Sequence, residues 1–326
     1  MGILPRAENR AGVRSTVGDM ASWLEHPRYI RHREGLVKAL QRPKYRFRVL
    51  NPVIFLCGAR DSEGRDAIRN YFKKHHPTLN VFYAEKVWDI IATLGETDAL
   101  QMEAELAALA DLVIVVVESP GTFTELGAFS ISPDLRKKLL PIVDKKHEHA
   151  KSFIATGPLT WIDKESHFKP AIYAPLDGIL DGGKDLENRL ARIPKAKRTR
   201  LEDLSTSPKH LLFFICDLIA VIYPATLPLI MTYLNQIAPS VAATPTHVPT
   251  LVGLAVAMDL LRTMELTTGG KSETYYLPTD LVDASHPFHH SRYLYLEGHR
   301  AAYASVLLTF PEGRQLLEDA RAKKCS

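Results

Sequence analysis

The chain has 326 residues, of which 46% are hydrophobic and 24% are charged; these are the proportions of an ordinary globular protein with room for two domains. A formal net charge of +4 excludes a chain that coats nucleic acid with its whole surface, so a nucleic-acid contact would have to be local. No apolar run is long enough to span a bilayer, and the N-terminus lacks a signal-peptide core. The three cysteines are far apart, which favours a reduced, cytoplasmic protein.

The N-terminal segment, residues 1–45, contains many Arg and Lys residues and few apolar clusters. We expect it to be a basic arm that packs on the rest of the protein or on a partner. A nucleic-acid contact by this arm is the alternative, but a run of charge is not specific for it.

Residues 46–185 alternate between apolar, strand-like runs and helical patterns. Strands are predicted at 53–56, 81–83, 113–117, 139–143 and 171–173, and helices at 63–74, 85–94 and 100–109. This alternation predicts an α/β domain with a Rossmann-like, doubly wound parallel sheet.

The central strand, Val113 to Val117, runs into a turn that opens a helix. Pro120 and Gly121 break the strand, and Thr122 and Glu125 have the spacing of a capping box. The carboxyl edge of an open α/β sheet is where nucleotides and phosphates bind. Two interpretations of Glu125 stay open at this point: a capping residue or a residue of the binding site.

Polar residues and glycines collect where the predicted strands end, and several of them are carboxylates. Such a group suits chemistry at the anomeric carbon of a nucleotide, where one carboxylate attacks while others orient the sugar. The absence of a Walker lysine and of a G-x-G-x-x-G motif disfavours a kinase, an NTPase or a dehydrogenase. No metal site and no cofactor are expected, because the adjacent histidine pairs are better explained as surface residues. The candidate substrate-binding residues are Cys57, Gly58, Tyr83, Glu85, Asp111, Glu118, Ser119, Gly121 and Thr122.

A basic linker is predicted at residues 186–206. A solvated surface is the favoured interpretation of its charge, and contact with a phosphate backbone or a protein partner is the alternative. The candidate contact residues are Arg192, Lys195, Lys197, Arg198 and Arg200.

Residues 207–326 are mainly helical. Helices at 211–222, 228–237 and 249–264, followed by a hairpin around Gly269, have the order of a winged helix. The third helix is almost wholly apolar, whereas a helix that reads a DNA groove needs polar side chains. We therefore expect an interaction platform, closed by a last helical segment at 293–310.

Four segments carry a resemblance to a known family: Ile54–Gly58, Phe82–Glu85, Glu103–Asp111 and Glu118–Ser130. They are similar to the nucleoside 2-deoxyribosyltransferase-like fold, in particular to the effector subunits of bacterial retron anti-phage systems. The resemblance covers about residues 50–160, and the 118–130 block is its specific part. The segment from Ser152 to Pro158 also fits this effector group.

The resemblance implies catalytic roles for Glu125 as the nucleophile and for Glu103 as the carboxylate that orients it, with Asp111 opening the next strand. Glu103 replaces the usual aspartate of the family. Ser119 stands where the family tends to have an aspartate, and this departure argues against base exchange and for a different N-glycoside.

The function implied is a toxin-like N-glycosidase that cleaves a nucleotide, NAD being the first candidate, and arrests growth in an abortive infection. A reverse transcriptase and its RNA–DNA product, the msDNA, would be the restraining partners within a higher-order assembly. The alternatives are a non-catalytic nucleotide sensor, a metabolic nucleoside deoxyribosyltransferase, and a DNA-binding regulator that uses the winged helix.

Overall fold

The computed structural model describes residues 26–42, 47–83, 109–195, 197–242, 247–268, 271–282, 284, 288 and 294–325. Its centre is a five-stranded sheet, with the order β2-β1-β3-β4-β5 and every pair parallel. The strands are β1 (Val53–Cys57), β2 (Asn80–Tyr83), β3 (Leu112–Val117), β4 (Leu139–Asp144) and β5 (Ile172–Ala174). The predicted parallel α/β sheet is therefore confirmed.

Alternate residues of each strand feed two separate hydrophobic cores, as they must in a sheet that is buried on both faces. Val113, Val115 and Val117 of β3 pack with Leu126 and Phe129 of α6 (Pro120–Ile131) in the first core. Ile114 and Val116, on the opposite face, belong to the second core. That second core takes Ile68 and Phe72 from α3 (Glu63–His75) and Leu186 from α9 (Gly183–Leu190).

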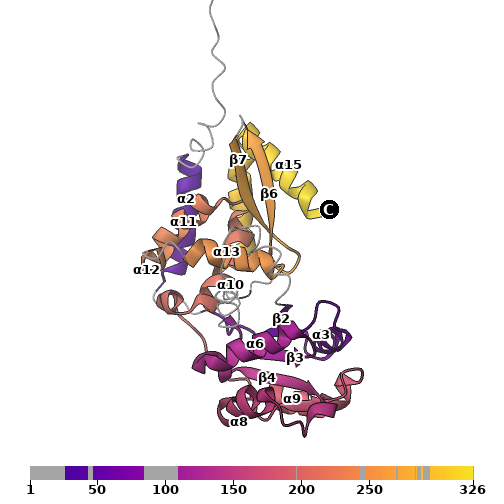
Figure 1. Ribbon diagram of the computed structural model, residues 1–326. Helices are drawn as coiled ribbons and strands as arrows, with labels where there is room; N and C mark the ends of the chain where they lie inside the picture. The colour runs from indigo at the N-terminus through magenta and orange to yellow at the C-terminus, as the bar shows by residue number, and fades with distance from the viewer. Residues whose placement is uncertain are drawn as a thin grey trace, which may run out of the picture.

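The helices of this domain are α3 (Glu63–His75), α6 (Pro120–Ile131), α7 (Pro133–Arg136), α8 (Thr160–Glu165) and α9 (Gly183–Leu190). Short turns connect them: η1 (Lys145–His147), the π-helical η2 (Ala155–Leu159) and η3 (Ile179–Gly182). In Figure 1 the sheet and these helices form the lower part of the molecule. The long apolar helix α10 leads from them into the upper part.

The C-terminal module contains α10 (Pro208–Ile222), α11 (Leu227–Ile237), α12 (Pro239–Ala242) and α13 (His247–Ala257), preceded by η4 (Leu201–Thr206). An antiparallel hairpin of β6 (Leu261–Thr268) and β7 (Lys271–Pro278) follows, then α14 (Leu296–Leu307) and α15 (Pro311–Cys325). A single bridge between Ala225 and Tyr276 joins the α10–α11 turn to β7. Helix α15 covers the hairpin, with Leu316 and Ala320 packed on Met264 and Tyr275 (Figure 1).

Two predictions for this module are corrected. The third helix does not continue to Met264, because Asp259 has a φ of 60° and turns the chain into the hairpin. Aspartate tolerates this left-handed conformation better than most residues do. Helix α15, which the sequence analysis did not predict, begins at Pro311. Among the helices that the structure describes, none combines the length and the hydropathy needed to cross a membrane.

The described part of the predicted basic arm packs on the rest of the protein, which is one of the two expected outcomes, and it does so as a helix. Within it, α2 (Pro27–Leu40) is a helix packed against α11 and α14, with Tyr29, Leu36 and Leu40 buried in the main core. The basic residues that suggested an arm lie on the outer face, where Arg28, Arg31 and Lys38 are exposed. The helix therefore belongs to the core of the C-terminal module.

Buried His32 on α2 makes the stability of this packing depend on pH. Its Nε2 donates to the carbonyl oxygen of His299 at 2.7 Å, and its Nδ1 accepts from the Tyr233 hydroxyl at 3.3 Å, so both nitrogens are satisfied in the neutral ring. Burial lowers the pKa of His32 from 6.5 to about 4, and the carbonyl of His299 opposes this shift only in part.

We expect the contribution of His32 to be complete above pH 6.5 and to disappear as the pH falls toward 4, because only the unfolded chain takes up the proton in that window. The expected loss in the free energy of unfolding is about 3 kcal/mol. Urea unfolding between pH 4 and 7 measures it. The slope of the free energy of unfolding against pH should flatten in His32→Phe. It should persist in His75→Gln, a change at the exposed end of α3. Equal slopes in wild type and His32→Phe would contradict a neutral, buried His32.

Candidate functional site

The site lies where the strand order reverses, at the carboxyl ends of β1 and β3. Chains leave these neighbouring strands toward opposite faces of the sheet, and in open α/β sheets the crevice expected at such a switch point is where ligands bind. Ala59, after β1, donates its backbone N–H to Oε1 of Glu118, after β3, at 2.9 Å. One oxygen of Glu118 is thereby committed to joining the two loops, and both loops are held at the edge of the crevice.

The turn into α6 is closed by a reciprocal cap formed by Ser119 and Thr122. The Thr122 hydroxyl accepts from the backbone N–H of Ser119 at 2.9 Å, and the Ser119 hydroxyl accepts from the N–H of Thr122 at 3.3 Å. The Thr122 hydroxyl also accepts from the N–H of Glu118 at 3.0 Å and donates to the carbonyl of Ser119 at 2.9 Å. The helix begins at Pro120, so Ser119 is the N-cap and the predicted cap at Thr122 is wrong by three residues.

This cap bears on one of the two interpretations of Glu125, the capping role. Because Ser119 and Thr122 supply both halves of the capping box, Glu125 is not its acidic member. Glu125 lies on the second turn of α6 and is half-buried, with its Oε2 shielded from solvent. The capping explanation of this glutamate is therefore removed.

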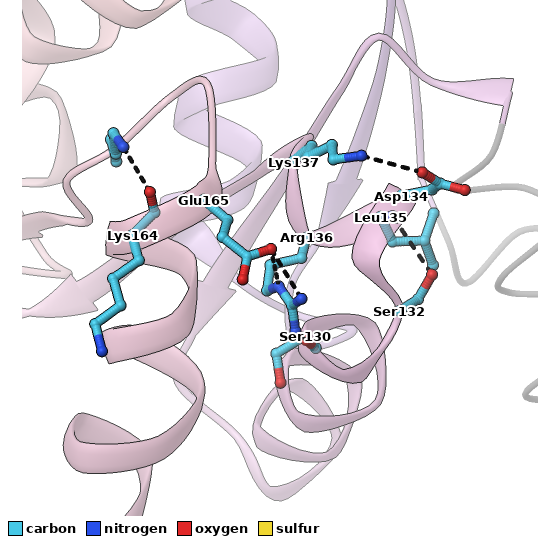
Figure 2. Close-up of polar contacts among 9 residues, drawn as sticks. Ser130, Ser132, Asp134, Leu135, Arg136, Lys137, Lys164 and Glu165 are labelled. Carbon is cyan, nitrogen blue, oxygen red and sulfur yellow. Dashed lines mark hydrogen bonds and ion pairs between the residues drawn. The ribbon is translucent and has the colours of Figure 1, made fainter.

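Helix α6, which carries Glu125, is fixed at its other end by Arg136 of α7. The Arg136 guanidinium donates to the carbonyl of Ser130 at 2.7 Å and to Oε2 of Glu165 at 2.9 Å, as Figure 2 shows. It also lies 5.3 Å from the ring centroid of Trp161 on α8. These contacts tie α6, α7 and α8 together, so that Glu125 is held on a rigid support.

A second cluster surrounds Tyr83 at the end of β2. Its hydroxyl donates to Oδ1 of Asp66 at 2.9 Å, and burial, followed by this hydrogen bond, raises the pKa of Tyr83. The guanidinium carbons of Arg65 and Arg69 lie 4.3 and 4.7 Å from the ring centroid. Arg65 also donates to the carbonyl of Arg60 at 2.7 Å and so holds the loop that follows β1.

Arg65 is a supporting residue that the sequence analysis missed. It is buried, and its stem passes over Gly58, where an added Cβ would lie 2.9 to 3.2 Å from the Arg65 side chain. The available signal was Gly58 after a buried strand. A glycine there indicates that some group lies close to the backbone, but it does not identify that group as the Arg65 side chain.

We expect Gly58→Ala to destabilise the protein by about 1–3 kcal/mol, because Arg65 must leave its place between the loop and Tyr83. Gly35→Ala is the matched control, since a Cβ at this exposed position of α2 meets nothing within 4 Å. That change should instead stabilise by about 0.5–1 kcal/mol, as expected for Gly to Ala inside a helix. Chemical denaturation of both variants measures the difference. Equal changes in stability in the two variants would show that the Arg65 side chain does not exclude a larger residue at position 58.

Three predicted substrate-binding residues do not face the crevice. The Cys57 side chain is wholly buried in the first core, and the Thr122 side chain is buried in the cap. Asp111 lies at the opposite, amino end of β3, where its Oδ2 accepts from the N–H of Val53 at 2.9 Å and its Oδ1 pairs with Lys209 at 2.6 Å. Asp111 is far from the site because it precedes β3, whereas the site is formed by residues that follow the strands. Glu85 and Glu103 lie outside the described residues.

The basic linker is used in part for structure. Arg189 is buried and donates to the carbonyl of Pro170 at 3.2 Å, while Arg192 donates to that of Lys169 at 2.6 Å. Arg192 is thus already engaged in holding the chain after α9. The other four candidates, Lys195, Lys197, Arg198 and Arg200, have exposed side chains. Within the described part of the chain, no group of three or more His, Cys, Asp or Glu residues could hold a metal ion.

Comparison with known proteins gives one family and two Escherichia coli relatives. The model of a family described as "STM3845 retron effector protein" matches residues 61–263, more than half of the chain. The "Retron Ec73 putative ribosyltransferase/DNA-binding protein" is 32% identical over 213 residues, which are 56% of this chain and 66% of the relative. The "Retron Ec86 putative ribosyltransferase/DNA-binding protein" is 38% identical over 124 residues, 37% of this chain and 40% of the relative. The matched region thus spans less than two thirds of either relative.

Proposed function

Since the chain belongs to the STM3845 retron effector protein family, we propose that it is a toxin effector of anti-phage defence whose α/β domain is an N-glycosidase. The observation that carries this proposal is the cap of α6. Ser119 and Thr122 complete it without Glu125, which lies on the second turn of the helix that begins at the switch point of the sheet. The relatives' names include a ribosyltransferase, and such enzymes also break bonds at an anomeric carbon.

The proposed reaction is a two-step displacement. The Glu125 carboxylate attacks the anomeric carbon of the ribose, the N-glycosidic bond breaks, and water then hydrolyses the glycosyl ester. A half-buried carboxylate on a helix that is fixed at both ends suits the first step, because its position is set before the sugar binds. NAD is the first candidate substrate, since nicotinamide leaves its pyridinium form as a neutral molecule and needs no proton from the protein.

The C-terminal module supplies the second half of the proposal. We infer that it is a winged-helix-like module, which is supported by the order of helices α10, α11 and α13 before the hairpin and by the Ala225–Tyr276 bridge. Its third helix, α13, is buried along Val248, Val252 and Ala255, which does not suit a helix that reads base edges. We assign this module to holding the reverse transcriptase and its msDNA, with Lys195, Lys197, Arg198 and Arg200 as the candidate phosphate contacts.

Expression of the chain with and without its reverse transcriptase and msDNA tests this function. We expect cellular NAD to fall and growth to stop when the chain is expressed alone, and both to stay normal with the partners until phage infection. Growth arrest at normal NAD would leave the glycosidase in place with another nucleotide as substrate. Arrest that Glu125→Gln does not relieve would favour the non-catalytic nucleotide sensor.

A further inference from the structure

A cavity of about 730 Å³ lies between the α/β domain and the C-terminal module, and one of its lining residues, Arg69, also contacts the Tyr83 ring described above. The residues leading into β1 (Arg48, Val49 and Asn51), one face of α3 and the amino end of β2 form one side. The other side comes from α10, the turn after α13 and the segment after β7. Its β2 wall runs from Thr78, which precedes the strand, to Phe82.

Charge is concentrated on one side of this cavity. Arg69, Lys73 and His76 are spaced as neighbours along one face of α3, and Arg48 joins them from before β1. None of the described residues that line the cavity is acidic. His76 pairs with Glu187 at 2.7 Å, and the guanidinium carbon of Arg69 lies 4.7 Å from the ring centroid of Tyr83. The formal positive charges on this side are those of Arg48, Arg69 and Lys73.

The opposite side is apolar and partly aromatic. Phe213 of α10 and Phe288 form a ring pair with centroids 4.9 Å apart. Phe213 and the third lining ring, Phe82 of β2, are buried, and Phe288 is half-buried. Leu260 and Leu281 complete this wall. Between the two sides, Asn51, Thr78 and Asn80 offer hydrogen-bonding groups. Sites for small ligands have this composition, with an apolar lining and a few polar groups that fix orientation.

We propose that this cavity is a second nucleotide site, which binds the phosphate of a phosphorylated nucleoside on Arg48, Arg69 and Lys73 and its base against the apolar wall, where Phe288 and Leu281 can be reached. The cationic side of the cavity suits a phosphate. A base of any kind can stack on an aromatic side chain, because every base has a flat π-face. A free mononucleotide and the end of a single strand present the same chemistry. Because both domains line the cavity, a bound nucleotide strengthens their docking, which gives the chain a means of sensing nucleotides apart from catalysis.

Protection of Lys73 from acetylation tests this site in the full-length Glu125→Gln chain, where the proposed turnover is absent. Lys74, its exposed neighbour on α3 that does not line the cavity, is the internal control. We expect AMP to slow acetylation of Lys73 at least fivefold and to leave Lys74 unchanged, as read by peptide mass spectrometry. Adenosine and inorganic phosphate should protect much less. Stronger protection by a short single-stranded oligonucleotide than by AMP would identify the end of a nucleic-acid strand as the natural ligand.

Binding measurements give the second readout. Lys73→Glu should weaken AMP binding at least tenfold, while Lys74→Glu, with the same change in charge, should not. Leu281→Asp should weaken it as well, compared with Leu308→Asp at another exposed apolar position. Equal protection by phosphate alone would reduce the cavity to a surface anion site and overturn the proposal. The absence of protection by both AMP and the oligonucleotide would also overturn it.

Discussion

Glu125→Gln lowers the rate of N-glycosidic cleavage by about a thousandfold or more, which corresponds to about 4 kcal/mol of lost transition-state stabilisation. The amide has the shape of the carboxylate but cannot form the glycosyl ester or stabilise an oxocarbenium-like centre with a full negative charge. The fold should survive, because Ser119 and Thr122 cap α6 without Glu125. Release of the free base from NAD by purified protein measures the effect.

Glu148→Gln is the matched control, since it makes the same chemical change at an exposed position after η1. Its rate should equal that of wild type, and the unfolding curves of all three proteins should coincide. A Glu125→Gln protein that is folded and retains wild-type cleavage would remove Glu125 from the reaction.

Asp111→Asn lowers the free energy of unfolding by about 2–3 kcal/mol and leaves the activity of each folded molecule unchanged. The carboxylate joins the start of β1 to the start of α10 through Val53 and Lys209. Burial lowers the pKa of the neighbouring Lys138, and the charge of Asp111 opposes that shift. Neutralising Asp111 therefore leaves Lys138 and Lys209 near each other without the negative charge that offsets them.

A double-mutant cycle with Lys209→Met separates the ion pair from the other contacts of Asp111. We expect the two changes together to cost about 1–2 kcal/mol less than the sum of the single changes. Urea unfolding and base-release kinetics on the same preparations give both readouts. A raised KM in Asp111→Asn at unchanged stability would restore the substrate-binding role that the sequence suggested.

The sheet could be predicted from the sequence because each strand carries its own signal. Val113–Val117 is apolar throughout, as a strand buried on both faces must be, and the turn residues after it mark its carboxyl end. Since parallel strands place their carboxyl ends at one edge, the meeting of Glu118 with the loop after β1 followed from the strand assignments. The structure adds the specific contact, with the N–H of Ala59 on Glu118.

Features that depend on distant parts of the chain could not be predicted in this way. Helix α2 is basic on the outside, and its burial depends on α11 and α14, more than 180 residues away. Arg65 has no local pattern that marks it as a buried support for Tyr83. The cap was misplaced by three residues because two overlapping sets of side chains, Ser119 with Thr122 and Thr122 with Glu125, fit the same spacing. Only the backbone conformation at Ser119 distinguishes them.

Trapping of the glycosyl ester tests the central claim most directly. A nucleotide substrate with fluorine at the 2-position of its sugar slows hydrolysis of the ester, so intact-mass analysis can detect the protein carrying the sugar. The account predicts one added glycosyl group in wild type, located by peptide mass spectrometry on the α6 residue Glu125, and none in Glu125→Gln. Rapid base release with no adduct, or an adduct on another residue, would contradict the assignment of Glu125 as the nucleophile.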